Sequence, residues 1–540
     1  MTQEGKGLGR RLFLGTSLGT VALGAAACRT EGAERTTTEA GEGLLPGHQP
    51  FAGVEPDLAA TEDVPAGYFR YPENPESILA DNPDHDMAPI SALLQAPSMP
   101  TPRDRNPWSQ LIEDHIGGEL HITGIPSGDY GDRLNVAIAG EELPDLVQIV
   151  GGTPDLPEVL DAYCVDLGEY LSGDRVQDYP ALAALPESAW RAGMVNGRLY
   201  GVAQPRSRAG MTWMMRTDMV EEMGLSFDDV TDGESFIEFF REVTNPNESR
   251  WAFGQDPYPR LVDSLYEMLG GLNQWGVVDG EFVQKVETPE YEQALELTRQ
   301  IWDEGLIHPD SFSAPAFDWW TGGNLVFYRN AFEEWTRGKI DHPDNEMSAV
   351  ASPDWDGNGV APKHLGIGSY SSFVAMGKTE DESRIEELLW AMNVLAVPFG
   401  SREYLDVNFG VEGEHYTVEG SDPRPTGEAV SYKSQSLLYV GGAEFTVLYS
   451  PGEDEMVRSQ HQFLSDTVPT GVEDPTVGLY SATDSARGQI ENQRLSDLQR
   501  EIIQGREPVS AFADAVEEWR SSVGEAIRDE YAEAAAEAEE

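Results

Sequence analysis

Side chains that could carry out covalent chemistry are present in this chain, but they follow no catalytic pattern. With 95 aspartate and glutamate residues, a pair of catalytic carboxylates cannot be located from spacing. No HExxH, GxSxG or phosphate-loop motif stands out. Cys164 lies in an apolar setting and is expected to be a small core residue, and no cysteine–histidine metal spacing exists. We therefore expect no catalytic residue, metal or cofactor.

The residues best suited to hold a ligand are aromatic and charged. Aromatic rings pack against C–H faces, and arginine or carboxylate groups make paired hydrogen bonds with neighbouring hydroxyls. Trp319 and Trp320 are the strongest candidates, because they lie in an expected loop after Pro309 and Pro315. The other candidates are Trp108, Asp129, Tyr130, Arg206, Arg208, Trp213, Arg329, Trp335, Tyr370 and Glu412. Core packing or ordinary ion pairs are the alternative role for each of them.

The first 28 residues carry an export signal of the lipoprotein type. Arg10 and Arg11 form a twin-arginine pair before a short apolar run that ends at residue 27. A run this short, flanked by positive charge, indicates export rather than a membrane span. Three alanines precede Cys28, as in a lipoprotein cleavage box, although leucine usually stands where Ala25 does. We expect lipidation of Cys28 and a position on the outer face of the cell membrane.

The composition limits the class of partner. The formal net charge is −59, so the chain lacks the clustered lysine and arginine that nucleic-acid binding requires. Only six of the 36 basic residues are lysines. Dense carboxylates with little lysine stay hydrated where salt screens their repulsion, which is typical of a saline habitat. A genome that favours arginine codons is the alternative.

The expected elements predict an α/β fold with more than one compact part. A chain of 540 residues exceeds what one core usually holds. Residues 28–85 are polar and aperiodic, and are expected to form a flexible acidic tether. Beyond residue 88, strand and helix patterns alternate, which predicts a mostly parallel sheet. Ligands of such sheets lie at the carboxyl ends of strands, here the loops at 96–106, 126–130 and 151–154.

Several later helices have a clear apolar face. One is expected over 236–243 after Thr231 and Asp232, and one over 291–302 between Pro289 and Gly305. Further apolar faces lie at 385–395 and 509–527. Four tryptophans on helical faces are assigned to the core: Trp190, Trp302, Trp390 and Trp519. The run 354–359 opens like a calcium loop, but Leu365 stands where the bidentate acid is needed, so a turn is expected.

An ordered set of short motifs resembles the family 1 extracellular solute-binding proteins of ABC importers, in particular their longer lipoprotein branch. The matching segments are 106–108, 143–145, 179–182 with Trp190, 196–202, 216–218, 288–291, 304–307 and 410–417. No single segment is specific, but their order along the chain is.

The resemblance implies a periplasmic-binding-protein-like fold of the class II type, with two α/β lobes and a ligand cleft between them. We expect lobe 1 to comprise 86–206 with 360–402, and lobe 2 to comprise 207–359 with 403–540. The chain is expected to cross between the lobes near 205–208, 358–364 and 399–404.

The resemblance also implies a binding function without catalysis. The protein is expected to capture a saccharide, in particular an oligosaccharide, by lobe closure. Its implied partners are this solute and the transmembrane subunits of an ABC permease, and it is expected to be a monomer. A secreted glycoside hydrolase and a non-transport surface sensor or adhesin are the alternatives; release of an intact solute distinguishes the first of these.

Overall fold

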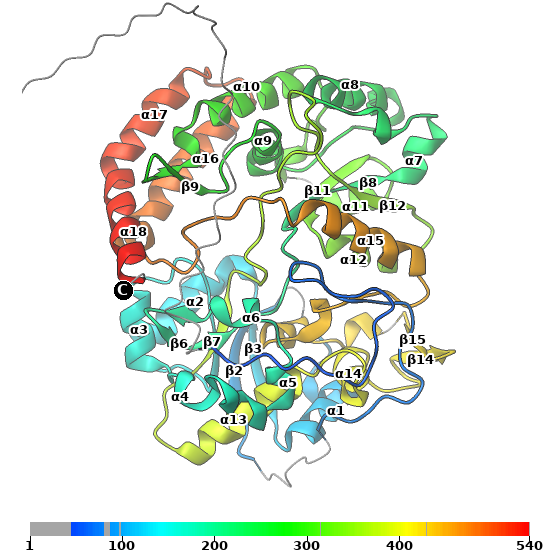
Figure 1. The fold of residues 1–540 in the computed structure, drawn as a ribbon, viewed down its shortest axis with the longest axis vertical. Helices are drawn as coiled ribbons and strands as arrows, with labels where there is room; N and C mark the ends of the chain where they lie inside the picture. The colour runs from blue at the N-terminus through cyan, green and yellow to red at the C-terminus, as the bar shows by residue number, and fades with distance from the viewer. Residues whose placement is uncertain (1–44, 80–86, 97–98, 314, 428, 539–540) are drawn as a thin grey trace, which may run out of the picture. The chain divides into compact units, whose positions relative to one another are not determined.

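Two β-sheets, each with its own hydrophobic core, organise the protein (Figure 1). The structure is a computed structural model that describes residues 45–79, 87–96, 99–313, 315–427 and 429–538. Arg10, Arg11 and Cys28 lie outside the described residues. None of the helices in the described ranges combines the length and apolar character that a bilayer span requires.

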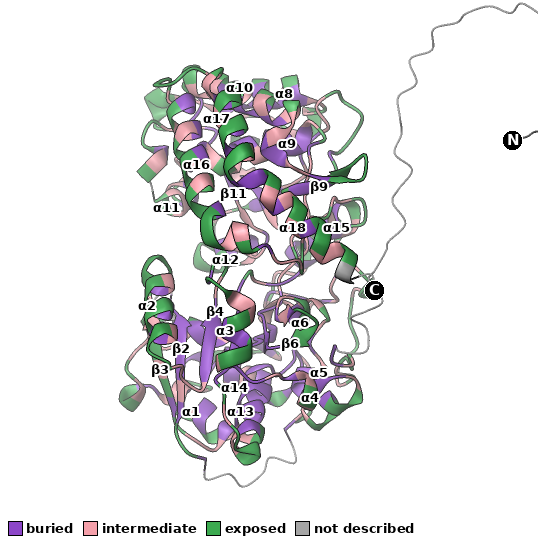
Figure 2. Cartoon of the chain, turned by 90° about the vertical axis from the view of Figure 1, so that its left-hand side faces the viewer, coloured by how far each residue is buried: buried purple, intermediate pink, exposed green. Residues whose placement is uncertain are grey.

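The larger sheet has five strands in the order β3-β2-β4-β13-β7, and we call the part built on it lobe 1. Its strands are β2 (Ile90–Gln95), β3 (Leu120–Ile125), β4 (Leu146–Ile149), β7 (Gly201–Val202) and β13 (Phe373–Met376). β2 runs parallel to β3 and β4, whereas β13 is antiparallel to both of its neighbours. β2 and β4 are apolar and largely buried, as strands covered on both faces must be (Figure 2).

Helices and short hairpins complete lobe 1. They are α1 (Pro107–Ile116), α2 (Ser127–Ala139), α3 (Leu156–Tyr163), α4 (Gly168–Leu171), α5 (Pro180–Ala183), α6 (Ser188–Arg191), α13 (Glu382–Leu395), α14 (Arg402–Asn408), β5 (Met194–Val195), β6 (Arg198–Leu199), β14 (Tyr416–Glu419) and β15 (Asp422–Pro425). Asn106 begins α1 by accepting the N–H groups of Trp108 and Ser109, and Gly117 ends it with a φ of 83°. Cys164 is buried in the core, as its apolar setting predicted.

The smaller sheet has three antiparallel strands in the order β11-β8-β12, and we call the part built on it lobe 2. The strands are β8 (Met211–Arg216), β11 (Phe327–Ala331) and β12 (Met347–Val350), with a separate hairpin of β9 (Trp275–Val278) and β10 (Glu281–Gln284). Its helices are α7 (Thr217–Glu222), α8 (Gly233–Val243), α9 (Pro257–Met268), α10 (Pro289–Asp303), α11 (Ala316–Thr321), α12 (Glu334–Asp341), α15 (Asp454–Thr467), α16 (Gln489–Ile503), α17 (Ala511–Trp519) and α18 (Glu525–Ala538).

The apolar faces expected from the sequence build the core of lobe 2. Asp232 and Ser235 cap α8 reciprocally, and this fixes the start of the helix whose face includes Phe236 and Phe240. Both rings pack around the indole of Trp213, at centroid distances of 6.0 and 6.1 Å. The helices expected over 236–243, 291–302 and 385–395 are confirmed as α8, α10 and α13. The run 354–359 is a turn in which Asp354 accepts N–H groups of its own loop.

Two crossing segments join the lobes and pair with one another. An antiparallel bridge links Pro205 to Ser369. The N–H of Arg206 donates to the carbonyl of Gly368 at 3.0 Å, and the N–H of Tyr370 donates to the carbonyl of Gln204 at 2.8 Å. The first of the two paired segments contains the expected crossing at 205–208. The second paired segment runs over 364–370, so it begins where the second expected crossing, 358–364, ends.

The third expected crossing, at 399–404, is wrong. Phe399 and Tyr404 are both 3% exposed and pack into the core of lobe 1. The chain stays with that core as far as Ala443 and enters the core of lobe 2 at Leu448 and Met456. The error arose because a short helix such as α14 carries no sign of which core its apolar residues join.

The expected tether is also wrong over its described part, 45–79. Tyr68 and Tyr71 pack into the core of lobe 1, and Val64 packs into that of lobe 2. The short strand β1 (Gly67–Tyr68) pairs in parallel with β16 (Leu448–Tyr449). An extended segment of this kind lacks helical periodicity, so its aromatic residues gave no pattern that the sequence could reveal.

This packing predicts a large stabilising contribution from Tyr71. Its ring contacts Phe399 at 5.2 Å, its hydroxyl donates to the carbonyl of Ser401, and its N–H donates to Asp422 at 2.8 Å. We expect Tyr71→Ala to lower the free energy of unfolding by about 3 to 5 kcal/mol, measured by urea denaturation. Glu73→Ala, at an exposed position nearby, is the control. Equal stability of the two variants would contradict the packed arrangement.

Candidate functional site

Arg206 and Tyr370 come together on the paired crossing segments. The Arg206 guanidinium lies over the rings of Phe445 and Tyr370, at 4.6 and 5.4 Å from their centroids. It donates to the Gln204 side chain at 3.2 Å and lies 3.5 Å from the Glu333 carboxylate of lobe 2. Within the described part of the chain, Nε of Arg206 is buried without a hydrogen-bond partner. A flat cation and aromatic rings thus meet where the two lobes join.

A group of neutral polar side chains lies in lobe 1 beside these segments. Nε2 of Gln148 donates to Oγ of Ser372 at 2.7 Å and lies 3.4 Å from Oε1 of Gln95. The N–H of Gln95 donates back to Oε1 of Gln148 at 2.8 Å. We call Gln95, Gln148 and Ser372 the amide group. Because Ser372 accepts from Gln148, its own hydroxyl hydrogen is left to donate.

The fold explains where the amide group lies. Gln95 ends β2 and Gln148 lies near the end of β4, so the two amides share the carboxyl edge of the parallel strands. Ser372 precedes β13 and follows Tyr370 by two residues. Sequence analysis missed all three residues, because a glutamine in a short apolar strand gives no sign of the face that it occupies. The expected location of ligands at strand ends was the only signal that could have found them.

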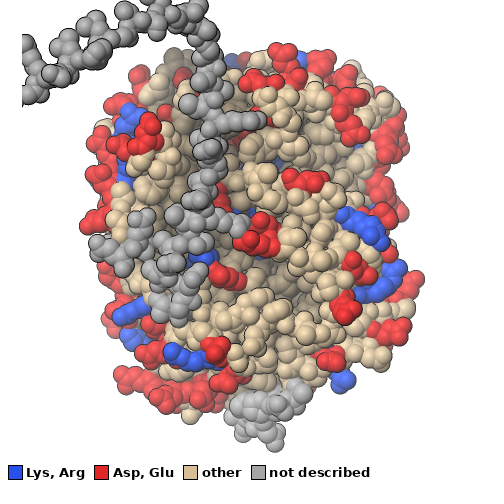
Figure 3. Space-filling model, viewed as in Figure 1, with Lys and Arg blue, Asp and Glu red and all other residues tan. Residues whose placement is uncertain are grey.

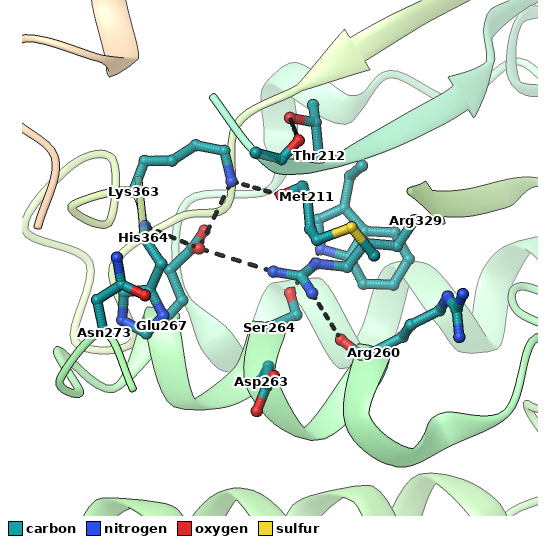
Figure 4. Close-up of polar contacts among 12 residues, drawn as sticks. Met211, Thr212, Arg260, Asp263, Ser264, Glu267, Asn273, Arg329, Lys363 and His364 are labelled. Atoms are coloured by element: carbon teal, nitrogen blue, oxygen red, sulfur yellow. Dashed lines mark hydrogen bonds and ion pairs between the residues drawn. The ribbon is translucent and has the colours of Figure 1, made fainter. Parts of the chain in front are cut away.

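A buried charge cluster ties the second crossing segment to lobe 2 (Figure 4). Oε2 of Glu267, on α9, lies 3.5 Å from Nζ of Lys363 and 3.7 Å from Nη2 of Arg329. It also accepts the N–H of His364 at 3.1 Å. Nζ of Lys363 donates to the carbonyl of Met211, which begins β8, at 2.6 Å. One carboxylate therefore joins α9, β11 and the crossing segment.

The electrostatics of the cluster favour the charged form of Glu267. Burial alone would raise the pKa of this carboxyl, but Lys363 and Arg329 outweigh that effect and lower it. Burial lowers the pKa of Lys363, and Glu267 opposes that change. The side chains of all three residues are at most 7% exposed. Arg329, a candidate ligand residue, thus serves an internal ion pair in this conformation.

Five of the aromatic candidates lie in hydrophobic cores rather than on an open surface. Each is at most 3% exposed; they are Trp108, Tyr130, Trp213, Trp320 and Trp335. The Tyr130 hydroxyl donates to the carbonyl groups of Leu93 and Gln148, and Trp320 stacks on Tyr328 at 5.2 Å. Burying a large ring in a core is strongly favourable, and a buried ring has no face left for a ligand. In this conformation none of the five rings presents a face to a solute.

Trp319 lies on helix α11, so the expected loop is wrong. Pro315 is the N-cap of the short helix α11, whose six residues are Ala316–Thr321. The helix turns the side chain of Trp320 into the core and leaves Trp319 partly exposed. The Trp319 ring is partly buried against His308, at a centroid distance of 4.0 Å. Trp319 is therefore available to solvent in part, on a stack separate from the crossing segments.

The charged candidates are divided between free and paired positions. Asp129, in the first turn of α2, and Glu412 are exposed. Arg208 is paired with Asp63 at 3.0 Å and with Glu473 at 2.5 Å, and so joins the N-terminal segment to the crossing region. The face in Figure 3 carries many acidic side chains and few basic ones. Few arginines are therefore present to pair with these carboxylates.

Comparison with known proteins bears on this arrangement. Residues 110–355 match the family model described as bacterial extracellular solute-binding protein. The chain is 23% identical over 475 residues to Lipoprotein LipO of Bacillus subtilis strain 168. This alignment covers 81% of this chain and 90% of that protein. It is 24% identical over 453 residues to the polygalacturonan/rhamnogalacturonan-binding protein YtcQ of the same strain, covering 80% and 88%.

Solved structures show a similar fold. The N-glycan transport solute binding protein NgtS of Streptococcus pneumoniae superposes with a TM-score of 0.61 at 15% identity, covering 84% of this chain and 99% of that one. The expected resemblance to extracellular solute-binding proteins and the expected two-lobe α/β fold are thereby confirmed.

The charge cluster predicts a strong and pH-dependent contribution to stability. Glu267→Gln leaves Lys363 and Arg329 buried without a carboxylate, so we expect the free energy of unfolding to fall by about 3 to 5 kcal/mol at neutral pH. Because the folded-state pKa of Glu267 is lowered, its contribution is present above the ordinary carboxyl range and is lost as pH falls through the lowered pKa. Urea denaturation as a function of pH measures this.

The control for this prediction is Glu296→Gln, which removes an exposed carboxylate from α10. We expect that variant to follow the parent at every pH. A gap between Glu267→Gln and the parent that stays constant into acid solution would contradict a charged Glu267.

Proposed function

We propose that this chain is the extracytoplasmic solute-binding component of an ABC import system, which captures an oligosaccharide between its lobes and delivers it to a membrane permease. The observation that carries the proposal is the meeting of Arg206, Tyr370 and the amide group at the crossing segments. Rings, amides and a guanidinium are the groups that bind a ring with C–H faces and hydroxyl edges. The match to extracellular solute-binding proteins and the names of the relatives support the same reading.

The proposed contacts assign a role to each side chain. Tyr370 offers a ring face to the sugar C–H groups, and Arg206 donates to neighbouring hydroxyls. The Ser372 hydroxyl and the Gln95 amide donate from lobe 1, while Gln148 holds both in place. Three other sequence candidates remain at least partly exposed: Asp129, Trp319 and Glu412. We keep them as proposed ligand contacts, but they have no assigned role at the crossing segments.

Capture follows from the two-lobe arrangement. The crossing segments belong to both lobes, so a change in their backbone angles alters the space between the lobes. A solute that contacts both lobes binds the closed form better than the open form and shifts the equilibrium toward it. Affinity then depends on the contacts of both lobes together.

Localisation and partners form part of the same proposal. Lipidation of Cys28 after twin-arginine export would hold the protein on the outer face of the membrane, where permease subunits can receive the solute. A saline habitat would suit the formal net charge of −59.

Screening by thermal shift tests the proposed solute class. We expect oligosaccharides to raise the melting temperature in a concentration-dependent manner, because a ligand selective for the native state stabilises it, and amino acids and peptides to leave it unchanged. Mass spectrometry of the recovered saccharide then separates the alternatives. An intact saccharide supports binding, cleaved products favour a glycoside hydrolase, and no shift with any saccharide contradicts the proposal.

The role of Arg206 yields a second prediction. We expect Arg206→Met to weaken saccharide binding at least about tenfold in titration calorimetry, because hydrogen bonds from a charged donor are lost. Arg337→Met is a matched control, since Arg337 also lies over an aromatic ring, 4.5 Å from the centroid of Phe317, but on α12. Equal affinities of the two variants would remove Arg206 from the site.

A further inference from the structure

A contact between the lobes exists away from the crossing segments. The Ser485 hydroxyl donates to the carbonyl of Thr153 at 3.1 Å. The Tyr480 hydroxyl lies near the backbone of Leu156 and the Ser485 side chain. Gly152 lies against Gln489, whose Nε2 would be 1.5 Å from a Cβ atom built on that glycine. Residues 480–489 therefore lie directly on the loop at 152–156.

The two sides of this contact belong to different cores. The loop at 152–156 leads from β4 into α3, whose Leu160 is buried in lobe 1. Gln489 begins α16, whose Leu495 and Ile502 are buried in the core of lobe 2. The contact thus joins the lobes directly, without any shared strand.

The lobe 2 side of the contact is held rigidly. The Glu530 carboxylate, on α18, accepts the N–H of Thr483 at 2.9 Å and its hydroxyl at 2.6 Å. It also accepts the Ser481 hydroxyl at 2.5 Å, and Ser481 in turn accepts the N–H of Asp484 at 3.0 Å. The π-helical segment Asp484–Gly488, which carries Ser485, is therefore fixed to α18 on the lobe 2 side, so little conformational entropy is lost when the contact forms.

The lobe 1 side is linked to the proposed ligand site. The loop at 152–156 follows β4, and Thr153 bonds back to the carbonyl of Val150 at 2.8 Å. Gln148 of the amide group lies in that same strand, two residues before Val150. A solute that orders the carboxyl end of β4 therefore also orders the surface on which Ser485 and Gln489 rest.

We propose that residues 480–489 and the loop at 152–156 form a closure latch, which makes its contacts in the closed form and breaks them when the lobes separate. The latch depends on the lobe movement in the proposed function but not on the solute being a saccharide. Its few neutral hydrogen bonds suit a contact that must also break, since each contributes only modestly to the net free energy. The latch thereby sets the ratio of closed to open molecules and the rate of solute release.

Distance measurements between the lobes test the latch without any ligand. Spin labels are placed at Val136→Cys on α2 and Val277→Cys on β9, which are 64% and 55% exposed. Cys28 is replaced by serine, and Cys164 is buried. In double electron–electron resonance, we expect Ser485→Ala with Gln489→Ala to raise the ratio of long to short distances about tenfold.

The matched control is Ser521→Ala with Gln493→Ala. Both of these side chains are exposed and bond only within their own helical segments, Ser521 to Glu518 and Gln493 to Asp497. We expect the control to keep the distance distribution of the parent. Circular dichroism verifies that every variant is folded, and Gln489→Ala alone serves if the double variant is not.

Each outcome decides between specific alternatives. A distribution that is identical in the latch and control variants overturns the latch. One fixed distance in every variant means that the contact is a permanent brace, which also overturns it. Faster release of a bound saccharide from the latch variant supports it further. Failure of every saccharide to bind, with the distance shift intact, would refute the proposed solute and leave the latch standing.

Discussion

The pairing of the crossing segments is the constraint on which the rest of the structure depends. Backbone hydrogen bonds between 204–208 and 366–370 hold two chain segments side by side at the place where each changes lobe. Buried backbone groups must be paired, so these segments cannot separate without a large loss of free energy. The lobes are thereby joined through a fixed pair of chain segments. The side chains of Arg206 and Tyr370 lie together on that pair.

Ion pairs fix the segments that surround this pair. The chain has 95 acidic and 36 basic residues, and many of its described arginines form ion pairs with carboxylates, as Arg208, Arg216 and Arg384 do. Glu267 illustrates the converse, since a single buried carboxylate holds both Lys363 and Arg329. The cost of burying these charges is offset only while all three are present, so the cluster fixes the crossing segment to lobe 2. Arg206 combines both kinds of contact, because its guanidinium lies over two aromatic rings and 3.5 Å from the Glu333 carboxylate.

The N-terminal segment and the C-terminal helices also make contacts that connect the two lobes. Arg208 connects the N-terminal segment at Asp63 to the chain after α15 at Glu473. Residues 481–488 are fixed to α18, and Ser485 in their π-helical part contacts the loop after β4. Segments that look like peripheral additions in the sequence therefore contact both lobes.

The sequence by itself determined the class of fold, the helices α8, α10 and α13, and the resemblance to solute-binding proteins. These features depend on local periodicity, capping residues such as Asp232 and short ordered motifs, which neighbouring residues specify on their own. Only the tertiary structure decided that Trp320 is buried while Trp319 reaches the surface, and that Phe399 and Tyr404 stay in lobe 1. It alone brought Gln95, Gln148 and Ser372 together. The physical reason is that long-range pairing depends on which apolar faces share a core, and the spacing of residues along the chain does not contain that information.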